Sequence, residues 1–86
     1  MTRKELIYKI CDETYHMLKI IESCKTEEQI DNANNLACSL VDKWFNLKAN
    51  FSFSYGADIA HYINSSAHDM TICVEKAKKK IEKNMH

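Results

Sequence analysis

Apolar residues recur every three or four positions along most of this chain, which is the spacing of one face of an α-helix. The pattern is clearest in two stretches, each of which keeps seven apolar residues on one stripe. The first stripe contains Ile30, Ala33, Ala37, Leu40, Trp44, Leu47 and Phe51. The second contains Ala60, Ile63, Ala67, Met70, Val74, Ala77 and Ile81. This spacing predicts an all-α fold, because a strand would repeat at every second position.

Two capping boxes predict where the first two helices begin. Each box places a threonine three residues before an acidic or amide residue: Thr2 before Glu5, and Thr26 before Gln29. The threonine hydroxyl can then accept a hydrogen bond from a backbone N–H of the first turn. We therefore expect helices over about residues 3–24 and 27–50. The connection between them is short, so the two helices should be antiparallel neighbours.

A third helix is predicted over about residues 55–83. Ser54 is the expected N-cap, and Asp58 would then fall in the first turn, where a carboxylate is favourable. The preceding segment, 51–56, alternates apolar and polar residues as a strand does. One isolated strand has nothing to pair with, so we interpret this segment as a connector.

Residues 1–86 form a single domain on this interpretation, and a three-helix up-down-up bundle is its simplest arrangement. The first helix would bury one face, made of Leu6, Ile7, Ile10, Met17, Leu18, Ile21 and Cys24. A chain of 86 residues buries only about 60–65% of its unfolded surface, so its core is small. A helical hairpin that completes its core by dimerising is therefore the alternative.

The charge is balanced, with 12 basic and 12 acidic residues. This balance disfavours a dedicated nucleic-acid or membrane-surface protein. Basic residues nevertheless gather near the C-terminus, as Lys76, Lys78, Lys79, Lys80 and Lys83. Lysines there complement the dipole of the last helix, and contact with nucleic acid or another acidic partner is the alternative function for them.

A cytoplasmic location is expected from the cysteines and from the N-terminal pattern. The N-terminus mixes charged and apolar residues, unlike a signal peptide, and no stretch has the roughly 20 apolar residues of a membrane span. In the cytoplasm the four cysteines would stay reduced. They are Cys11, Cys24, Cys38 and Cys73.

Signatures of catalysis are missing from the sequence. It contains no glycine-rich phosphate loop, no nucleophile elbow and no His-Glu zinc motif. A small bundle also offers few concave pockets for a substrate. We therefore expect neither enzymatic activity nor a cofactor.

A zinc site is one alternative. If the helices fold back at the predicted turns, Cys11, Cys38 and His68 lie at one height in the bundle. Thiolate and imidazole are the ligands that zinc prefers. Ordinary packing or surface positions are the competing interpretation, because no Cys-x-x-Cys spacing is present.

Aromatic residues gather around the predicted turn between the second and third helices. Trp44 and Phe51 belong to the apolar stripe, whereas Phe45 and Phe53 fall outside it. Aromatic side chains outside the core favour an exposed surface for a partner. A cap over the end of the core is the competing interpretation of this group. The expected partner-binding residues are Phe45, Phe53, Tyr55 and Tyr62.

Tyrosines also occur in pairs seven residues apart, at Tyr8 and Tyr15 in the first helix and at Tyr55 and Tyr62 in the third. Together with Lys4 and Lys9, the first pair offers rings that could stack a base and ammonium groups that could hold a phosphate. Nucleotide binding is therefore a second alternative. An amphipathic rim of the bundle is the competing structural interpretation.

Protein–protein contact is the function that these patterns favour. We expect a non-catalytic adaptor, inhibitor or homo-oligomer, with a homodimer as the first expectation. The chain is rich in asparagine, lysine and isoleucine and contains no proline. Small proteins of AT-rich bacteria and their phages often have such a composition, which fits an origin in a phage or mobile element.

Overall fold

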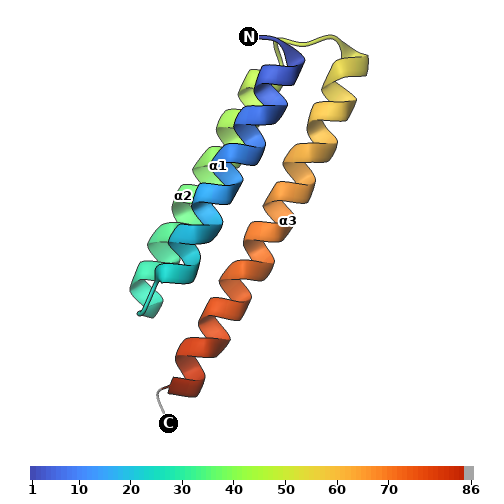
Figure 1. Cartoon of the computed structure of the whole chain (residues 1–86). Coiled ribbons are helices and arrows are strands. Elements are labelled where there is room, and N and C mark those ends of the chain that lie inside the picture. Colours follow the sequence, from blue (N-terminus) through green and yellow to red (C-terminus); the bar gives the residue numbers. More distant parts are fainter. Residues whose placement is uncertain (85–86) are drawn as a thin grey trace.

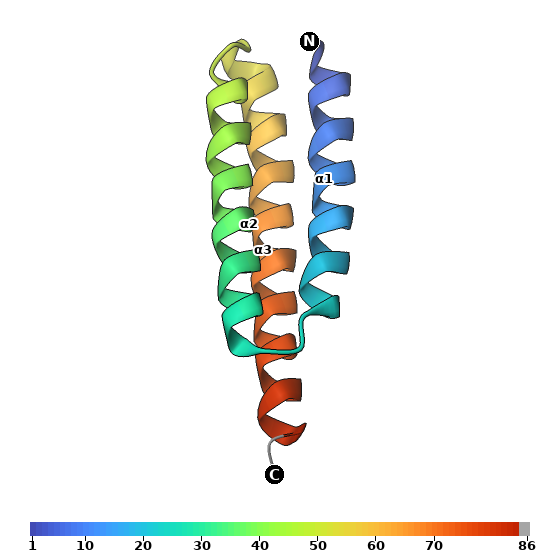
Figure 2. The same ribbon diagram turned by 90° about the vertical axis from the view of Figure 1, so that its left-hand side faces the viewer.

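The computed structural model describes residues 1–84, which fold into three α-helices without any strand (Figure 1). The helices are α1 (Arg3–Ser23), α2 (Glu27–Lys48) and α3 (Phe53–Asn84). α2 runs antiparallel to α1 and α3 (Figure 2). The predicted all-α, three-helix up-down-up bundle is therefore confirmed.

Both predicted capping boxes mark true helix starts. Thr2 and Thr26 are the N-caps, and each hydroxyl oxygen accepts a hydrogen bond of 3.1 Å from a backbone N–H three residues on. The Gln29 side chain reaches one residue further back than a standard box requires, because it accepts from the Lys25 N–H at 2.8 Å. The two starts were predictable because a cap depends on neighbouring residues only.

The predicted start of the third helix was wrong by two residues. α3 begins at Phe53, and the Gly56 N–H donates to the Ser52 carbonyl at 2.8 Å. Ser54 is therefore not the N-cap, and Asp58 does not lie in the first turn. The alternating segment 51–56 contains two serines, Ser52 and Ser54, and either could cap a helix. The earlier start adds two residues to the helix, and buried Gly56 then lies in its first turn beside the Lys48 side chain.

Twelve buried apolar side chains form the core of the described bundle. They are Leu6, Ile10, Met17, Ile21, Ile30, Ala33, Ala37, Trp44, Ile59, Ile63, Met70 and Val74. All of these except Ile59 were predicted from the stripes. Ile59 is fully buried, whereas its neighbour Ala60 on the predicted stripe is half-buried. α3 packs against both other helices, so its buried face is wider than one stripe.

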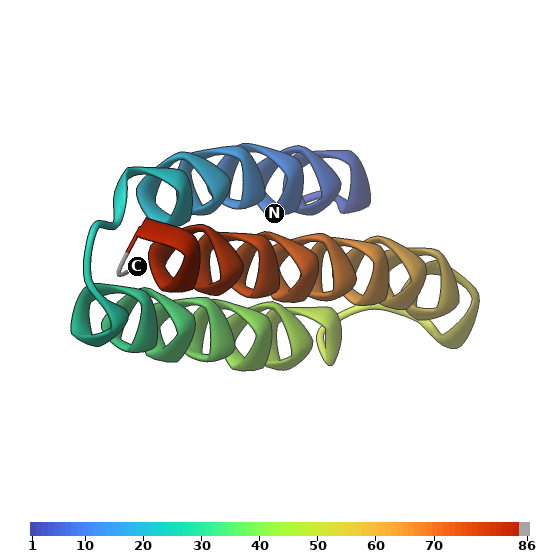
Figure 3. The same cartoon turned by 90° about the horizontal axis from the view of Figure 1, so that it is seen from below.

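The bundle is elongated, with extents of 51 × 16 × 15 Å. α3 has 32 residues against 21 and 22 in the others, so its last turns pass beyond the α1–α2 connection (Figure 2). Viewed from the C-terminal end, α3 projects between α1 and α2 (Figure 3). The two ends of the bundle therefore differ. One carries the α2–α3 connection, and the other carries the overhanging end of α3.

Candidate functional site

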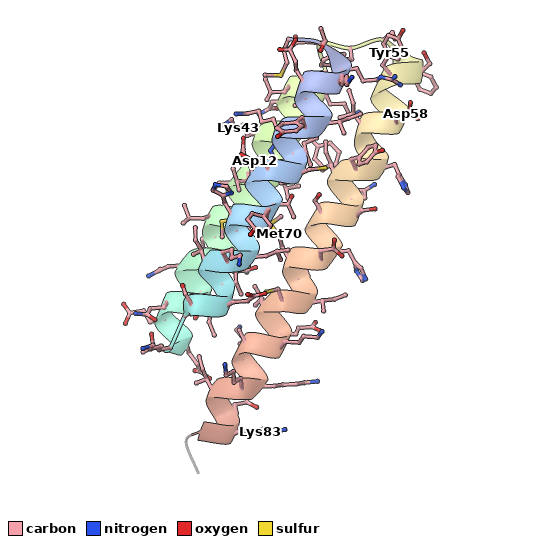
Figure 4. All side chains as sticks on the ribbon, in the orientation of Figure 1. Asp12, Lys43, Tyr55, Asp58, Met70 and Lys83 are labelled. Atoms are coloured by element: carbon pink, nitrogen blue, oxygen red, sulfur yellow. The ribbon has the colours of Figure 1, made fainter. Side chains whose placement is uncertain are left out.

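Three aromatic side chains lie where α2 ends and α3 begins. Phe53 is 95% exposed, Tyr55 50% and Phe45 37%. Figure 4 places Tyr55 at the same end of the bundle as the start of α1. We call Phe45, Phe53 and Tyr55 the aromatic end.

Arg3 fixes the position of Tyr55 from the neighbouring helix. Its guanidinium carbon lies 4.9 Å from the centre of the Tyr55 ring, and its Nη1 lies 2.8 Å from Oδ2 of Asp58. Both partners of the ion pair are exposed, so the pair contributes about 0–1 kcal/mol to stability. Its main consequence is positional, because it holds Tyr55 on the α1 side of α3. Tyr62 follows two helical turns later on the same side.

Phe45 belongs to α2 and not to α3. The Lys48 ammonium sits 5.9 Å from the centre of the Phe45 ring, and the same lysine passes beside Gly56 at the start of α3. The predicted partner-binding residues therefore come from two helices and do not form one continuous flat patch. Tyr55 lies beside Arg3 of α1, Phe45 belongs to α2, and Phe53 is the first residue of α3.

The tyrosines of α1 remain exposed, at Tyr8 and Tyr15. Lys9 is held by Glu13, with 2.8 Å between Nζ and Oε1, and this hydrogen bond raises the pKa of the Lys9 ammonium. Lys4 shares with Tyr8 a shallow depression that Glu5 also lines. A nucleotide phosphate bound beside Lys4 would be repelled by the Glu5 carboxylate. Lys9 is already paired with Glu13. The geometry therefore adds no support to nucleotide binding.

The predicted zinc ligands do not form a group. Cys11, Cys38 and His68 are all exposed, and each comes from a different helix. Among the described residues, no three His, Cys, Asp or Glu side chains are placed to hold a metal ion. Equal height along the bundle does not make side chains converge, because each residue's position around its own helix decides where it points.

Cys73 is one of two half-buried thiols among the four free cysteines, the other being Cys24. The Sγ of Cys73 lies 3.8 Å from the Leu18 carbonyl oxygen. Burial, assisted by the carboxylate of Glu22, raises the pKa of the Cys73 thiol. At a given pH it therefore holds less of the reactive thiolate.

We expect iodoacetamide at mildly alkaline pH to modify exposed Cys11 and Cys38 well before Cys73. Mass spectrometry of timed samples, followed by peptide mapping, measures the order. Denatured protein is the control, because unfolding removes the burial and should make the rates similar. Equal rates for Cys73 and Cys11 in folded protein would contradict this expectation.

Within the described residues, no helix has both the length and the apolar content needed to cross a membrane. Comparison with models of protein families, with curated proteins and with solved structures found no match to this chain. The case for a function therefore rests on the side chains of this bundle.

Proposed function

We propose that this protein acts without catalysis, through protein–protein contact at its aromatic end, and that its first partner is a second copy of the chain. The exposure of Phe53 carries the proposal. A phenylalanine that is 95% exposed contributes little to the fold of its own chain. Burying it against a partner would contribute about 1.5–3 kcal/mol to association.

The neighbours of Phe53 have the composition of a contact surface. Aromatic residues and arginine are enriched at the centres of protein interfaces, and the aromatic end combines Phe53 and Tyr55 with Arg3. Tyr55 is already oriented by Arg3, so less side-chain freedom would be lost on binding. These features favour an anchor made of Phe53 and Tyr55, with Phe45 contributing from the α2 side.

The total surface also supports association. The bundle exposes 6107 Å², which is about 900 Å² more than the roughly 5,200 Å² typical of a compact 10.0 kDa monomer. A standard interface buries about 800 Å² on each partner. The elongated bundle therefore has enough spare surface for one such contact. The four free thiols favour a cytoplasmic setting for it.

Phe53→Ser tests the proposal. We expect a loss of roughly 2 kcal/mol for each Phe53 that leaves the interface. Because both copies change in a symmetric dimer, this variant should weaken self-association by up to about 1,000-fold. Stability should stay within about 0.5 kcal/mol of the unchanged protein, because the side chain is exposed. Light scattering over a concentration series measures association, and urea denaturation measures stability.

Tyr8→Ser is the matched control, since it also removes an exposed aromatic ring but lies on α1 outside the aromatic end. It should leave self-association unchanged. A protein that is monomeric at every concentration would exclude the homodimer and leave an adaptor or inhibitor role. If Phe45→Glu combined with Phe53→Glu also left every complex from the native host intact, protein contact at this end would be wrong.

A further inference from the structure

A cavity opens at the end of the bundle opposite to the aromatic end. It has a volume of about 870 Å³ and lies between the end of α1 and the last turns of α3. Lysines from both segments line it: Lys25 from the α1–α2 connection, and Lys76 and Lys80 from α3. We call this the basic cavity. Figure 2 shows α3 passing the α1–α2 connection there, and Figure 4 places Lys83 further along the same helix.

The positive charge of the basic cavity is only partly compensated, because three lysines share its lining with one carboxylate. Glu22 is the one acidic residue in its lining. None of Lys25, Lys76 and Lys80 forms a salt bridge with another described residue. Lys78 is different, because its ammonium lies 3.4 Å from Asp31. Lys76 and Lys80 are four residues apart on one helical face, a spacing at which like charges repel.

The dipoles of the helices do not account for these lysines. The favourable effect of a cation is confined to the last turn of a helix, and the basic residue in the last turn of α3 is Lys83. At the end of α1, the carbonyl of Ile20 already accepts from the Ser23 hydroxyl at 2.7 Å and from the Cys24 thiol at 3.2 Å. Lys76 and Lys80 therefore have no structural role as helix caps.

Apolar and uncharged groups form the rest of the wall. Ala77 and Ile81 are half-buried and pack against the edge of the core, and the thiols of Cys24 and Cys73 complete this side. The lining contains no aromatic ring and no arginine, so it offers nothing for a nucleotide base to stack on. Charge and apolar surface thus lie side by side in a cavity of the size that holds small molecules.

We propose that the basic cavity binds an amphipathic anion, with its phosphate or carboxylate held by Lys25, Lys76 and Lys80 and its aliphatic chain lying over Ala77 and Ile81. Such an anion would relieve the repulsion among the three ammonium groups. It would also cover apolar surface that solvent reaches in the free protein. This site is separate from the aromatic end. A negative result for anion binding would therefore leave the proposed protein contact unaffected, and the reverse also holds.

Calorimetric titration with alkyl phosphates below their micelle concentrations is the direct test. We expect decyl phosphate to bind with measurable heat, and affinity to rise roughly three- to fourfold for each methylene added between the hexyl and decyl esters. Inorganic phosphate should bind far more weakly than any of these esters. Raising the salt concentration should weaken binding of every ester, because the lysines are exposed to solvent.

Two charge-matched variants locate the site. Lys76→Gln with Lys80→Gln removes two charges from the cavity, and it should weaken decyl phosphate binding about tenfold. Lys79→Gln with Lys83→Gln removes two charges from the same helix outside the cavity, and it should change affinity less than twofold. Thermal unfolding of both variants checks that each remains folded.

Three results would overturn the proposal. Equal weakening in the two double variants would mean that the C-terminal lysines attract anions diffusely. Affinity that does not depend on chain length would exclude the apolar part of the site. Binding only to vesicles of equal parts phosphatidylglycerol and phosphatidylcholine, and not to monomeric decyl phosphate, would identify a membrane-surface patch in place of a cavity.

Discussion

Trp44→Ala is expected to destabilise the folded protein by about 3–5 kcal/mol. Trp44 is the largest fully buried side chain, at 0% exposed, so its removal leaves a void that a three-helix core cannot easily close. The whole domain should have a stability of only about 4–13 kcal/mol, given its 86 residues. Urea denaturation followed by circular dichroism should show a large fall in midpoint, with partial loss of helix before any denaturant is added.

Trp44→Phe separates the volume of this side chain from its polar atom. The indole Nε1 is buried and has no hydrogen-bond partner among the described residues. Such a group costs about 1–3 kcal/mol, so its removal should offset much of the volume lost with the smaller ring. We expect a net loss below about 1.5 kcal/mol. A loss from Trp44→Phe as large as that from Trp44→Ala would show that the indole N–H is satisfied in solution.

Ile59→Ala is expected to cost about 2–5 kcal/mol of folding free energy. Ile59 is fully buried where α3 packs against the rest of the core. The same urea titration measures the loss.

Ile20→Ala removes the same atoms from a side chain that is 45% exposed on α1. It should cost less than about 1 kcal/mol. Similar losses at Ile59 and Ile20 would contradict the observed packing of α3. If Ile59→Ala cost less than about 1 kcal/mol of folding free energy, Ile59 would not be at the centre of the buried face of α3. The centre would then be at Ala60, as the stripe predicted.

The fold was largely predictable because its determinants are local or periodic. Thr2 and Thr26 cap helices through bonds to residues three positions away, so the sequence contains both partners. The stripe through Trp44 is periodic over more than five turns, and its central residues are buried as expected. Ser54 was a wrong cap, because Ser52 fits the same local pattern and α3 already begins at Phe53.

The candidate sites were predictable to a smaller extent. The position of Phe45 and Phe53 outside the stripe allowed either a cap over the core or an exposed patch, and both side chains are exposed. The basic cavity was missed, although the repeat of Lys76 and Lys80 at one helical turn was visible. The contribution of Lys25 was not visible, because 50 residues separate it from Lys76 in the chain.

The class of fold, the number of helices and most of the buried residues follow from the order of amino acids alone. Helical periodicity and capping depend on neighbours within about four positions, so no long-range information was needed. The axial and rotational alignment of the helices, by contrast, is set by their packing against one another. That alignment places Arg3 against Asp58 and gathers Lys25 with Lys76 and Lys80, while it keeps Cys11, Cys38 and His68 from forming a metal site. Side-chain convergence depends on how helices pack, which a single helix does not encode.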